Sequence, residues 1–328
     1  MSFNLNQVEI SIILPCYNEE EGIDLLFERL LGVLDTLNVT YEVVCVDDGS
    51  KDQTLQRLID YHHRYPAIKV VSLSRNFGKD IALTAGLENA QGQAMIPLDA
   101  DLQDPPELIE QMIAKWREGY DVVYAKRRSR QGESFIKQLT ANAFYRIISR
   151  ISSVPIPRDT GDFRLLDRRV VDALKRMPER TRFMKGLFAW VGFKQTYITF
   201  DRPNRHQGTT KWNYWKLWNF ALDGITSFSL IPLKVWTYLG GIISLLAFFY
   251  GSFLIMRTLI LGIDVPGYAS LMVTMLFIGG IQLITLGILG EYLGRIYEEV
   301  KQRPLYLIRE RYGFNIDPTQ MKQGNYSL

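Results

Sequence analysis

The sequence contains little cysteine and little histidine, with two cysteines and three histidines among 328 residues. A disulfide framework needs more cysteines and an oxidising compartment, so we expect Cys16 and Cys45 to be reduced thiols in apolar core segments. His62 and His63 fall on a predicted helix with no cysteine or carboxylate cluster at metal-ligand spacing, which indicates surface residues. His206 lies in a basic segment, where contact with a phosphate is the alternative to a surface position.

The chain also lacks a strong charge of either sign. Its formal net charge is +3, with 22% charged and 47% hydrophobic residues, so the total does not indicate a nucleic-acid-binding protein. The first ten residues show no basic segment followed by an apolar one, so no secretory signal peptide is predicted. The length predicts one sizeable domain together with a further element.

Two stretches, residues 235–256 and 268–290, contain no charged residue at all. Each is long enough for a transmembrane helix, which needs about 20 apolar residues. A pair of buried core helices is the alternative, but long core helices usually carry charges on an outer face. The connector is short and contains Pro266 and Gly267. We therefore predict an antiparallel transmembrane hairpin with its two flanking parts on the same side of the membrane.

The distribution of lysine and arginine predicts the orientation of this hairpin. Basic residues precede the first apolar run and follow the second, whereas the connector has Arg257 offset by Asp264. By the positive-inside rule, the hydrophilic parts and both termini face the cytoplasm, at the cell inner (plasma) membrane. The flanking basic residues are Lys211, Lys216, Lys234, Arg295, Lys301, Arg303, Arg309 and Arg311.

These patterns divide the chain into four segments. They are a cytoplasmic domain over 1–205, an amphipathic juxtamembrane segment over 206–233, the hairpin over 234–294 and a cytoplasmic basic tail over 295–328. Within the second segment, tryptophans, tyrosines and lysines mix as in a helix that lies on a membrane surface, with an ordinary helix packed on the domain as the alternative. Small residues four apart, Gly240 with Ser244 and Gly290 with Gly294, permit close helix approach and leave a homo-oligomer open.

The first segment alternates apolar strand-like runs with helical patterns. Strands are expected at 10–14, 41–46, 69–73, 94–98 and 121–125, with helices at 20–37, 52–65, 82–90 and 105–117. This alternation predicts an α/β domain of Rossmann-like type, with a mostly parallel sheet covered by helices. Ligands of such sheets bind beyond the carboxyl ends of the strands.

Polar motifs follow these strands directly. Tyr17 comes after the first strand and offers a face on which a base can stack, and Asp47 and Asp48 follow the second next to a glycine. After the fourth strand come Asp99 and Asp101, whose alternation predicts an oxygen-rich site for a divalent cation that bridges a diphosphate. The alternatives are a plain turn with a helix cap for the first pair and a solvated acidic turn for the second.

Taken together, the motifs resemble family 2 glycosyltransferases with the GT-A fold, over nearly the whole chain. The closer resemblance is to the polyprenyl-phosphate branch, which includes the bacterial bactoprenol-phosphate glucosyltransferases and dolichol-phosphate mannose synthase. The resemblance is carried by Leu14-Pro15-x-Tyr17-Asn18-Glu19, Val46-Asp47-Asp48-Gly49-Ser50, Asn76-Phe77-Gly78-Lys79, Asp99-Ala100-Asp101-Leu102-Gln103-Asp104-Pro105-Pro106 and Gly161-Asp162-Phe163-Arg164.

This resemblance implies roles for individual residues. Arg127 takes the place of an arginine that follows the fifth strand in the family; Arg128 is its rival, because Lys126 stands where the family has a small residue. The residues implied at the nucleotide are Pro15, Tyr17, Glu19, Val46, Asp48, Asp99, Ala100, Arg127 and Lys185. The implied ligands of Mg²⁺ or Mn²⁺ are Asp101, Gln103 and Asp99. The implied catalytic residues are Asp162, near the acceptor, with Arg205 and Lys211 in a basic segment that contacts phosphate. For these cations, attraction to the membrane surface is the alternative role.

The implied acceptor is a lipid monophosphate, whose second pKa of about 6 makes it largely dianionic at neutral pH. Such a nucleophile needs positioning more than a strong base. Arg205, Lys211 and the cation would screen the repulsion between the two anionic substrates and stabilise the departing diphosphate. We therefore expect one in-line displacement with inversion at the anomeric carbon. Asp162 would then orient the acceptor rather than act as a base. The alternative is a structural ion pair between Asp162 and Arg164 or Arg158.

The expected function is transfer of a hexose from a nucleotide sugar to polyprenyl (undecaprenyl) phosphate, with UDP-glucose as the first donor. GDP-mannose and a UDP-linked amino sugar are the alternative donors. The sequence is less consistent with a processive polysaccharide synthase. The spacing from Gln207 to Trp212 differs from the Gln-x-x-Arg-Trp pattern of those enzymes, and two helices make no obvious pore. An inactive membrane scaffold is disfavoured by the intact Asp99, Asp101 and Gln103.

Overall fold

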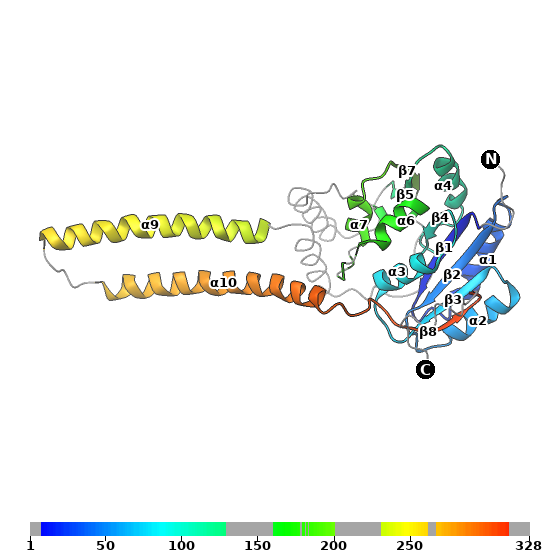
Figure 1. The fold of residues 1–328 in the computed structure, drawn as a ribbon, viewed down its shortest axis with the longest axis horizontal. Coiled ribbons are helices and arrows are strands. Elements are labelled where there is room, and N and C mark those ends of the chain that lie inside the picture. The colour runs from blue at the N-terminus through cyan, green and yellow to red at the C-terminus, as the bar shows by residue number, and fades with distance from the viewer. Residues whose placement is uncertain are drawn as a thin grey trace.

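The computed structural model describes residues 8–128, 160–177, 179–180, 182, 184–200, 231–261 and 267–314. These residues form an α/β domain, from which two long helices extend side by side (Figure 1). Cys16 and Cys45 are both buried in the α/β domain, and burial raises the pKa of both thiols. They are therefore inert core residues, as the sequence predicts.

The α/β domain begins with the predicted alternation of strands and helices. The successive elements are β1 (Ile10–Cys16), α1 (Ile23–Leu34), β2 (Tyr41–Asp47), α2 (Thr54–Arg64), β3 (Ile68–Leu73), α3 (Lys79–Asn89), β4 (Ala94–Pro97), α4 (Leu108–Arg117) and β5 (Val122–Arg127). The sequence did not predict the next described elements, β6 (Thr160–Asp167), α6 (Arg168–Lys175), α7 (Met184–Trp190) and β7 (Gln195–Phe200). The chain continues through α9 (Ile231–Leu261), α10 (Tyr268–Val300) and β8 (Ile308–Tyr312).

The strands form one sheet of eight in the order β7-β5-β6-β4-β1-β2-β3-β8. The pairs β4·β1, β1·β2, β2·β3 and β5·β7 are parallel. Strand β6 runs antiparallel between β4 and β5, and β8 runs antiparallel along β3. The prediction of a mostly parallel sheet is therefore confirmed, with two antiparallel strands that sequence reasoning missed.

Each face of the sheet carries its own apolar core, because successive side chains of a strand point to opposite faces. Ile12 and Leu14 of β1 pack with α1, α2 and α4, whereas Ile13 packs with α3, α6 and α7. All three side chains are fully buried. This burial on both faces explains why the strands read as continuous apolar runs rather than as alternating patterns.

Helix α3 packs closely on β1 at Gly86. A Cβ atom at this position would lie 2.2 Å from Cγ2 of Ile13 and 3.3 Å from Cγ2 of Val46. Both neighbours are fully buried, so neither side chain has room to move away. The glycine therefore sets how near α3 lies to the strands that end at the polar motifs.

Gly86→Ala is expected to lower the free energy of unfolding by up to about 2 kcal/mol, because overpacking costs about 1–3 kcal/mol and the gain in helix propensity recovers about 1 kcal/mol. The measurement is the midpoint of thermal unfolding of the purified full chain in detergent. Gly32→Ala in α1 is the matched control, since a Cβ there meets nothing within 4 Å, and it is expected to be neutral or stabilising. Equal stabilisation by both substitutions would contradict the close packing at Gly86.

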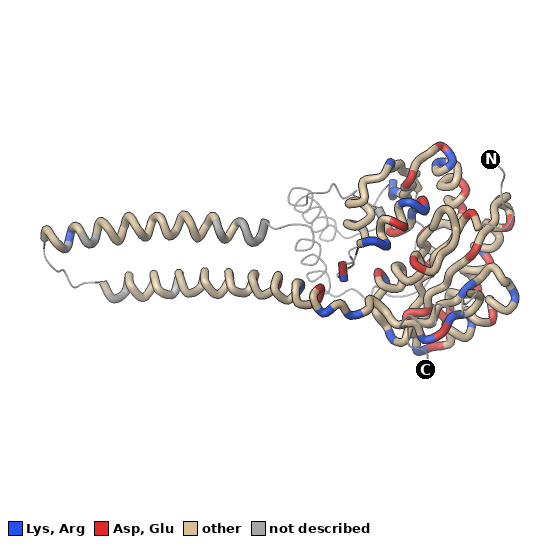
Figure 2. The backbone as a smooth tube through the Cα atoms, in the orientation of Figure 1, with Lys and Arg blue, Asp and Glu red and all other residues tan. Residues whose placement is uncertain are grey.

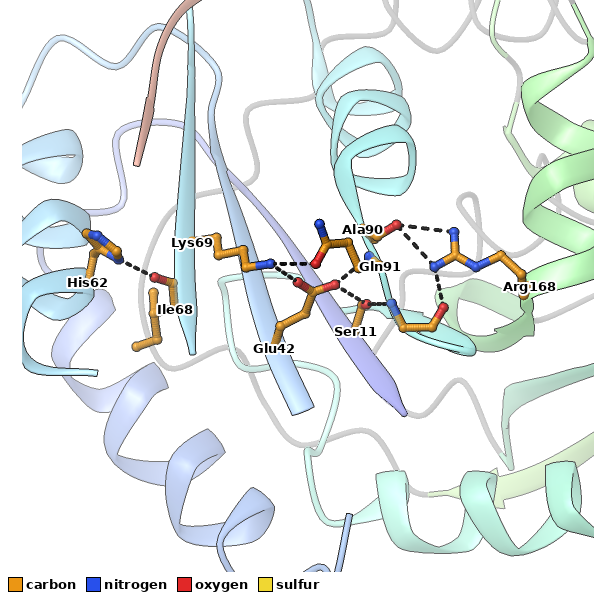
Figure 3. Close-up of polar contacts among 9 residues, drawn as sticks. Ser11, Glu42, His62, Ile68, Lys69, Ala90, Gln91 and Arg168 are labelled. Atoms are coloured by element: carbon orange, nitrogen blue, oxygen red, sulfur yellow. Dashed lines mark hydrogen bonds and ion pairs between the residues drawn. The ribbon is translucent and has the colours of Figure 1, made fainter. Parts of the chain in front are cut away.

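A buried polar cluster holds the other end of the sheet (Figure 3). The carboxylate of Glu42, on β2, accepts hydrogen bonds from the Ser11 hydroxyl at 2.6 Å and from the Gln91 amide nitrogen at 2.5 Å. It also pairs with the Lys69 ammonium at 2.6 Å. Arg168 donates to the carbonyl oxygen atoms of Ala90 and Gly92. This cluster fixes the turn from α3 to β4 and is structural, because it lies at the amino ends of the strands, away from the motif loops.

The two long helices carry most of the exposed apolar surface of the described chain. They run antiparallel and are almost free of charged residues until the end of α10 that faces the α/β domain (Figure 2). By length and composition, one helix among the described residues qualifies as a membrane span: Ser270–Val300, with a mean hydropathy of 2.1 and no part buried inside the protein. A shorter apolar stretch, Tyr238–Phe253, lies within α9. Residues 206–230 of the predicted juxtamembrane segment and residues 262–266 of the connector lie outside the described residues.

The chain returns from α10 to the α/β domain as strand β8, which lies within the segment expected to be a basic tail. Leu307 accepts a hydrogen bond from the Ser74 amide nitrogen at 2.9 Å, and Arg309 donates to the Ser74 carbonyl oxygen at 2.8 Å. Glu299, near the end of α10, accepts from the amide nitrogen of Arg180 at 2.7 Å. The end of α10 is thereby tied to Arg180, between α6 and α7, and the segment after α10 is tied to the loop that follows β3.

Candidate functional site

Four motif loops converge at one edge of the sheet, because β1 to β4 are parallel and their carboxyl ends lie together. The loops after β1 and β2 are bonded to each other directly. The Asn18 amide nitrogen donates to the Ser50 hydroxyl at 3.0 Å, and the Lys51 amide nitrogen donates to the Asn18 side-chain oxygen at 2.8 Å. Asn18 holds a left-handed conformation with φ 53°, which asparagine tolerates better than most residues.

The loop after β2 also rests on the loop after β3. Gly49 has φ +66°, and a Cβ there would lie 2.5 Å from the carbonyl carbon of Arg75 and 2.7 Å from the amide nitrogen of Asn76. Backbone atoms cannot yield as a flexible side chain can, so glycine is required at this position. The two loops therefore act as one unit.

Asp48 joins these loops through its carboxylate. Its two oxygen atoms accept hydrogen bonds from the amide nitrogens of Phe77 at 2.7 Å and Gly78 at 2.9 Å. The side chain is buried, and burial raises the pKa of Asp48 although the two amide hydrogen bonds act in the opposite direction. Its neighbour Asp47 faces inward and accepts from the Ser50 amide and the Ser72 hydroxyl.

Lys79, the first residue of α3, brings two predicted site carboxylates together. Its ammonium lies 2.8 Å from a carboxylate oxygen of Asp99 and 2.8 Å from Oδ2 of Asp162. Burial alone would lower the pKa of Lys79, but the charges of Asp99 and Asp162 outweigh it and raise the pKa. Burial raises the pKa of Asp99, as does the nearby charge of Asp162, while Lys79 opposes the shift.

The sheet register explains why Asp99 and Asp162 meet. Strand β6 pairs antiparallel with β4 through Ala94↔Asp167 and Met95↔Leu166. The same register, continued past the end of β4 at Pro97, places Asp162 opposite Asp99. The antiparallel insertion of β6 thus carries the Gly161–Arg164 motif to the carboxyl edge of a parallel strand.

The acidic motif lies directly after β4, as the sequence predicts, but in a turn where the expected strand-end alternation of Asp99 and Asp101 does not hold. Strand β4 ends at Pro97, and Leu102 has φ 57°, so a strand-like alternation of the carboxylates does not apply. Within the turn, Asp101 accepts a hydrogen bond from the Gln103 amide nitrogen at 3.2 Å. A strained left-handed leucine here indicates that the surrounding structure holds the turn in place.

The oxygen donors of this turn fit a cation that is only partly coordinated by protein. Among the described residues, no group of three or more histidine, cysteine, aspartate or glutamate side chains is placed to hold a metal ion. Magnesium in nucleotide sites is usually held by one or two carboxylates together with substrate phosphates. Asp101 and Gln103 suit that arrangement, whereas the Asp99 carboxylate already faces the Lys79 ammonium.

The other residues expected at a nucleotide differ in how far they are accessible. Tyr17 has a 36% exposed side chain and Pro15 is half-buried, so both present surface beyond β1. The backbone nitrogen of Glu19 donates to the Thr54 hydroxyl at 2.9 Å. Val46 is fully buried on the α3 face, and Ala100 is 7% exposed. The Val46 side chain therefore belongs to the core, so only the backbone of Val46 is left for the expected contact with the nucleotide.

The basic residues expected at phosphate lie outside what the structure describes. Arg205 and Lys211 fall in 201–230, and the side chains of Arg127, on β5, and Lys185, on α7, are likewise not described. Arg164 is described: its guanidinium donates to the Gly161 carbonyl oxygen at 2.7 Å and lies 4.2 Å from the centre of the Phe188 ring. Burial lowers the pKa of Arg164 to about 10, although the Asp162 charge opposes the shift.

Sequence reasoning gave no role to Lys79. In the sequence it is only the last residue of the Asn76–Lys79 motif, and its contacts depend on how α3 and β6 are placed. A signal was nonetheless present, because a lysine directly after a glycine at a predicted strand-to-helix turn is well placed to reach an anion.

Comparison with known proteins covers nearly the whole chain. A family model described as "Glycosyl transferase family 2" matches residues 11–175, and one described as "GtrB C-terminal hairpin" matches residues 231–296. An uncharacterized glycosyltransferase of Synechocystis is 65% identical over 95% of this chain and 98% of its own. The "Prophage bactoprenol glucosyl transferase homolog" of Escherichia coli is 46% identical, over 92% and 99% of the two chains. The "Bactoprenol glucosyl transferase" of Shigella phage SfII is 46% identical, over 94% and 100%. The α/β domain is thus a GT-A domain, and the chain is a glycosyltransferase that belongs to family 2.

Proposed function

We propose that this glycosyltransferase transfers a hexose, in the first place glucose from UDP-glucose, to polyprenyl phosphate at the cytoplasmic face of the membrane. The observation that carries the proposal is the pairing of Asp99, in the expected donor motif, with Asp162, in the expected acceptor motif, through one ammonium. Support also comes from relatives that are named bactoprenol glucosyl transferases and match over more than nine-tenths of this chain.

The two long apolar helices support a lipid acceptor. The apolar helix Ser270–Val300 ends where the chain rejoins the α/β domain, and β8 then pairs beside the loop after β3. A lipid that is held at the bilayer by its chains would present its phosphate to a domain tethered in this way. The positive charge flanking the apolar runs favours a cytoplasmic position for that domain.

The chemistry follows from two anionic substrates that must meet. The acceptor phosphate is largely dianionic at neutral pH, so it attacks the anomeric carbon without a strong base. A divalent cation at Asp101 and Gln103 would supply charge neutralisation for the leaving diphosphate. Asp162, fixed by Lys79, orients the acceptor, and one in-line displacement then inverts the anomeric centre.

The proposal is tested by incubating membranes that contain the chain with polyprenyl phosphate and a panel of radiolabelled nucleotide sugars. We expect a lipid-linked product from UDP-glucose, its loss on addition of EDTA, and its recovery with Mg²⁺ or Mn²⁺. The anomeric configuration of the product reports inversion. Product from GDP-mannose or a UDP-amino sugar alone would change the donor and keep the reaction. No lipid-linked product from any donor would refute the proposal.

A further inference from the structure

Lys79 contacts both the nucleotide-side motif, at Asp99, and the acceptor-side motif, at Asp162. Asp99 lies in the turn after β4 and Asp162 lies on β6. The paired residues of β4 and β6 are Ala94 with Asp167 and Met95 with Leu166, so the strand pairing does not include Asp99 or Asp162. Two carboxylates that share one partner repel each other, by several kcal/mol at about 4 Å in a partly buried site. An ammonium between them removes that repulsion and fixes their separation.

The backbone position of Lys79 is fixed by the loop before it and by the packing of α3. Phe77 and Gly78, the two residues before it, donate their amide hydrogens to the buried carboxylate of Asp48. On its other side, α3 is locked against β1 by the close approach at Gly86. The backbone of Lys79 is therefore held by the Asp48 hydrogen bonds and by the packing of α3 at Gly86. This places its ammonium next to the two carboxylates.

The exposure of the three side chains fits a working site rather than a core ion pair. Lys79 is 45% exposed, Asp99 27% and Asp162 14%. The ammonium can be removed without unfolding the domain, because carboxylates that reach solvent can move apart and relieve their repulsion. Its removal should therefore alter the geometry of the carboxylates more than the stability of the fold.

We propose that Lys79 is a positioning residue for the transfer reaction, which holds the Asp162 carboxylate at a fixed place against Asp99. The inference rests on the proposed function and adds a residue to it. Lys79 acts through Asp162, on the acceptor side, so its loss lowers the turnover number and leaves the Michaelis constant for the donor nearly unchanged.

The test compares Lys79→Met, Lys79→Gln and Lys79→Arg in the purified full chain, with UDP-glucose and polyprenyl phosphate as substrates. Lys79→Met is expected to lower kcat about 10- to 100-fold, since a misplacement of about 1 Å near the reacting groups costs on that order. The KM for UDP-glucose is expected to stay within about threefold, and Lys79→Arg to recover most of the loss, because a guanidinium also bridges two carboxylates.

A double-substitution cycle with Asp162→Asn tests the contact itself. Lys79→Met with Asp162→Asn is expected to be no slower than the slower single variant, because the two residues act as one unit. Multiplied losses would overturn the inference, as would a wild-type kcat in Lys79→Met. If Lys79→Met fails to fold, Lys79→Gln replaces it in the same kcat measurements, alone and combined with Asp162→Asn.

Controls separate this inference from a purely structural role and from the proposed function. Lys115→Met removes an exposed lysine that pairs with Glu118 at the C-terminal end of α4, and wild-type kinetics are expected. A Lys79→Met chain that unfolds several degrees lower but keeps its kcat would assign Lys79 to the fold alone and overturn the inference. A wild-type chain that glycosylates no lipid phosphate refutes the proposed function, whereas an active wild type with an equally active Lys79→Met refutes only the role of Lys79.

Discussion

Asp101→Ala is expected to abolish hexose transfer while leaving the fold intact. Asp101 lies in the turn after β4, where it accepts a hydrogen bond from the Gln103 backbone and offers oxygen donors for a cation that also binds the substrate diphosphate. Charge stabilisation by such a cation is worth several kcal/mol, so we expect the rate to fall about a thousandfold or more. The measurement is the initial rate of transfer from radiolabelled donor by the purified chain.

A second measurement separates loss of the cation from loss of the fold. Binding of Mn²⁺ in the presence of UDP, followed by paramagnetic resonance, is expected to disappear in Asp101→Ala. Asp24→Ala is a matched control, because Asp24 is an exposed carboxylate that pairs with Arg57 on α2. Its rate and Mn²⁺ binding are expected to equal those of the wild type. Unchanged turnover in Asp101→Ala would remove the metal assignment from this residue.

The parallel half of the sheet was predictable because its signal is local. Each strand from β1 to β4 is an apolar run buried on both faces, and each is followed by a turn and a helix. Because ligands of such sheets bind beyond the carboxyl ends of the strands, the loops that contain Asp48 and Asp99 were the predicted site. The ends of the elements differ from the predicted ends by a few residues; β4, for example, ends at Pro97, one residue before the predicted end.

The antiparallel strands were not predictable in the same way, because their partners are distant in sequence. Strand β6 pairs with β4, more than sixty residues earlier, and β8 pairs with β3 across the whole of α9 and α10. The sequence of β8 contains Arg309, Glu310 and Arg311, which indicated only a charged tail. Alternate residues of an edge strand face solvent and are often charged, so this pattern is compatible with a strand once a partner edge is available.

The candidate site was predicted residue by residue but not as a geometry. The Asp48, Asp99 and Asp162 motifs were identified separately, and nothing in their spacing shows that Lys79 joins two of them or that Asp48 holds the loop before it. Those contacts depend on the register of β6 and on the depth at which α3 packs at Gly86. Both are tertiary features that no local window contains.

Asp48→Asn is expected to weaken nucleotide binding about 10- to 100-fold, because a hydrogen bond to a charged group contributes about 1.5–3 kcal/mol. The Asp48 carboxylate accepts from two amides, Phe77 at 2.7 Å and Gly78 at 2.9 Å. An asparagine has one acceptor oxygen, so its NH₂ group would face the second amide hydrogen, donor against donor. The loop would then lose one of its two fixed points beside the nucleotide motifs.

The measurement is titration calorimetry of UDP binding to the full chain in detergent, together with transfer kinetics. Asp60→Asn is the control, because Asp60 lies on the surface of α2 and accepts from Gln56, away from the motif loops. Wild-type affinity in Asp48→Asn would show that the Phe77–Gly78 loop does not depend on this carboxylate. Asp48 supports the donor loop whereas Lys79 reaches the acceptor-side carboxylate, so the two substitutions should separate. Asp48→Asn is expected to raise the dissociation constant for UDP, and Lys79→Met to lower kcat, although both act through the same short loop.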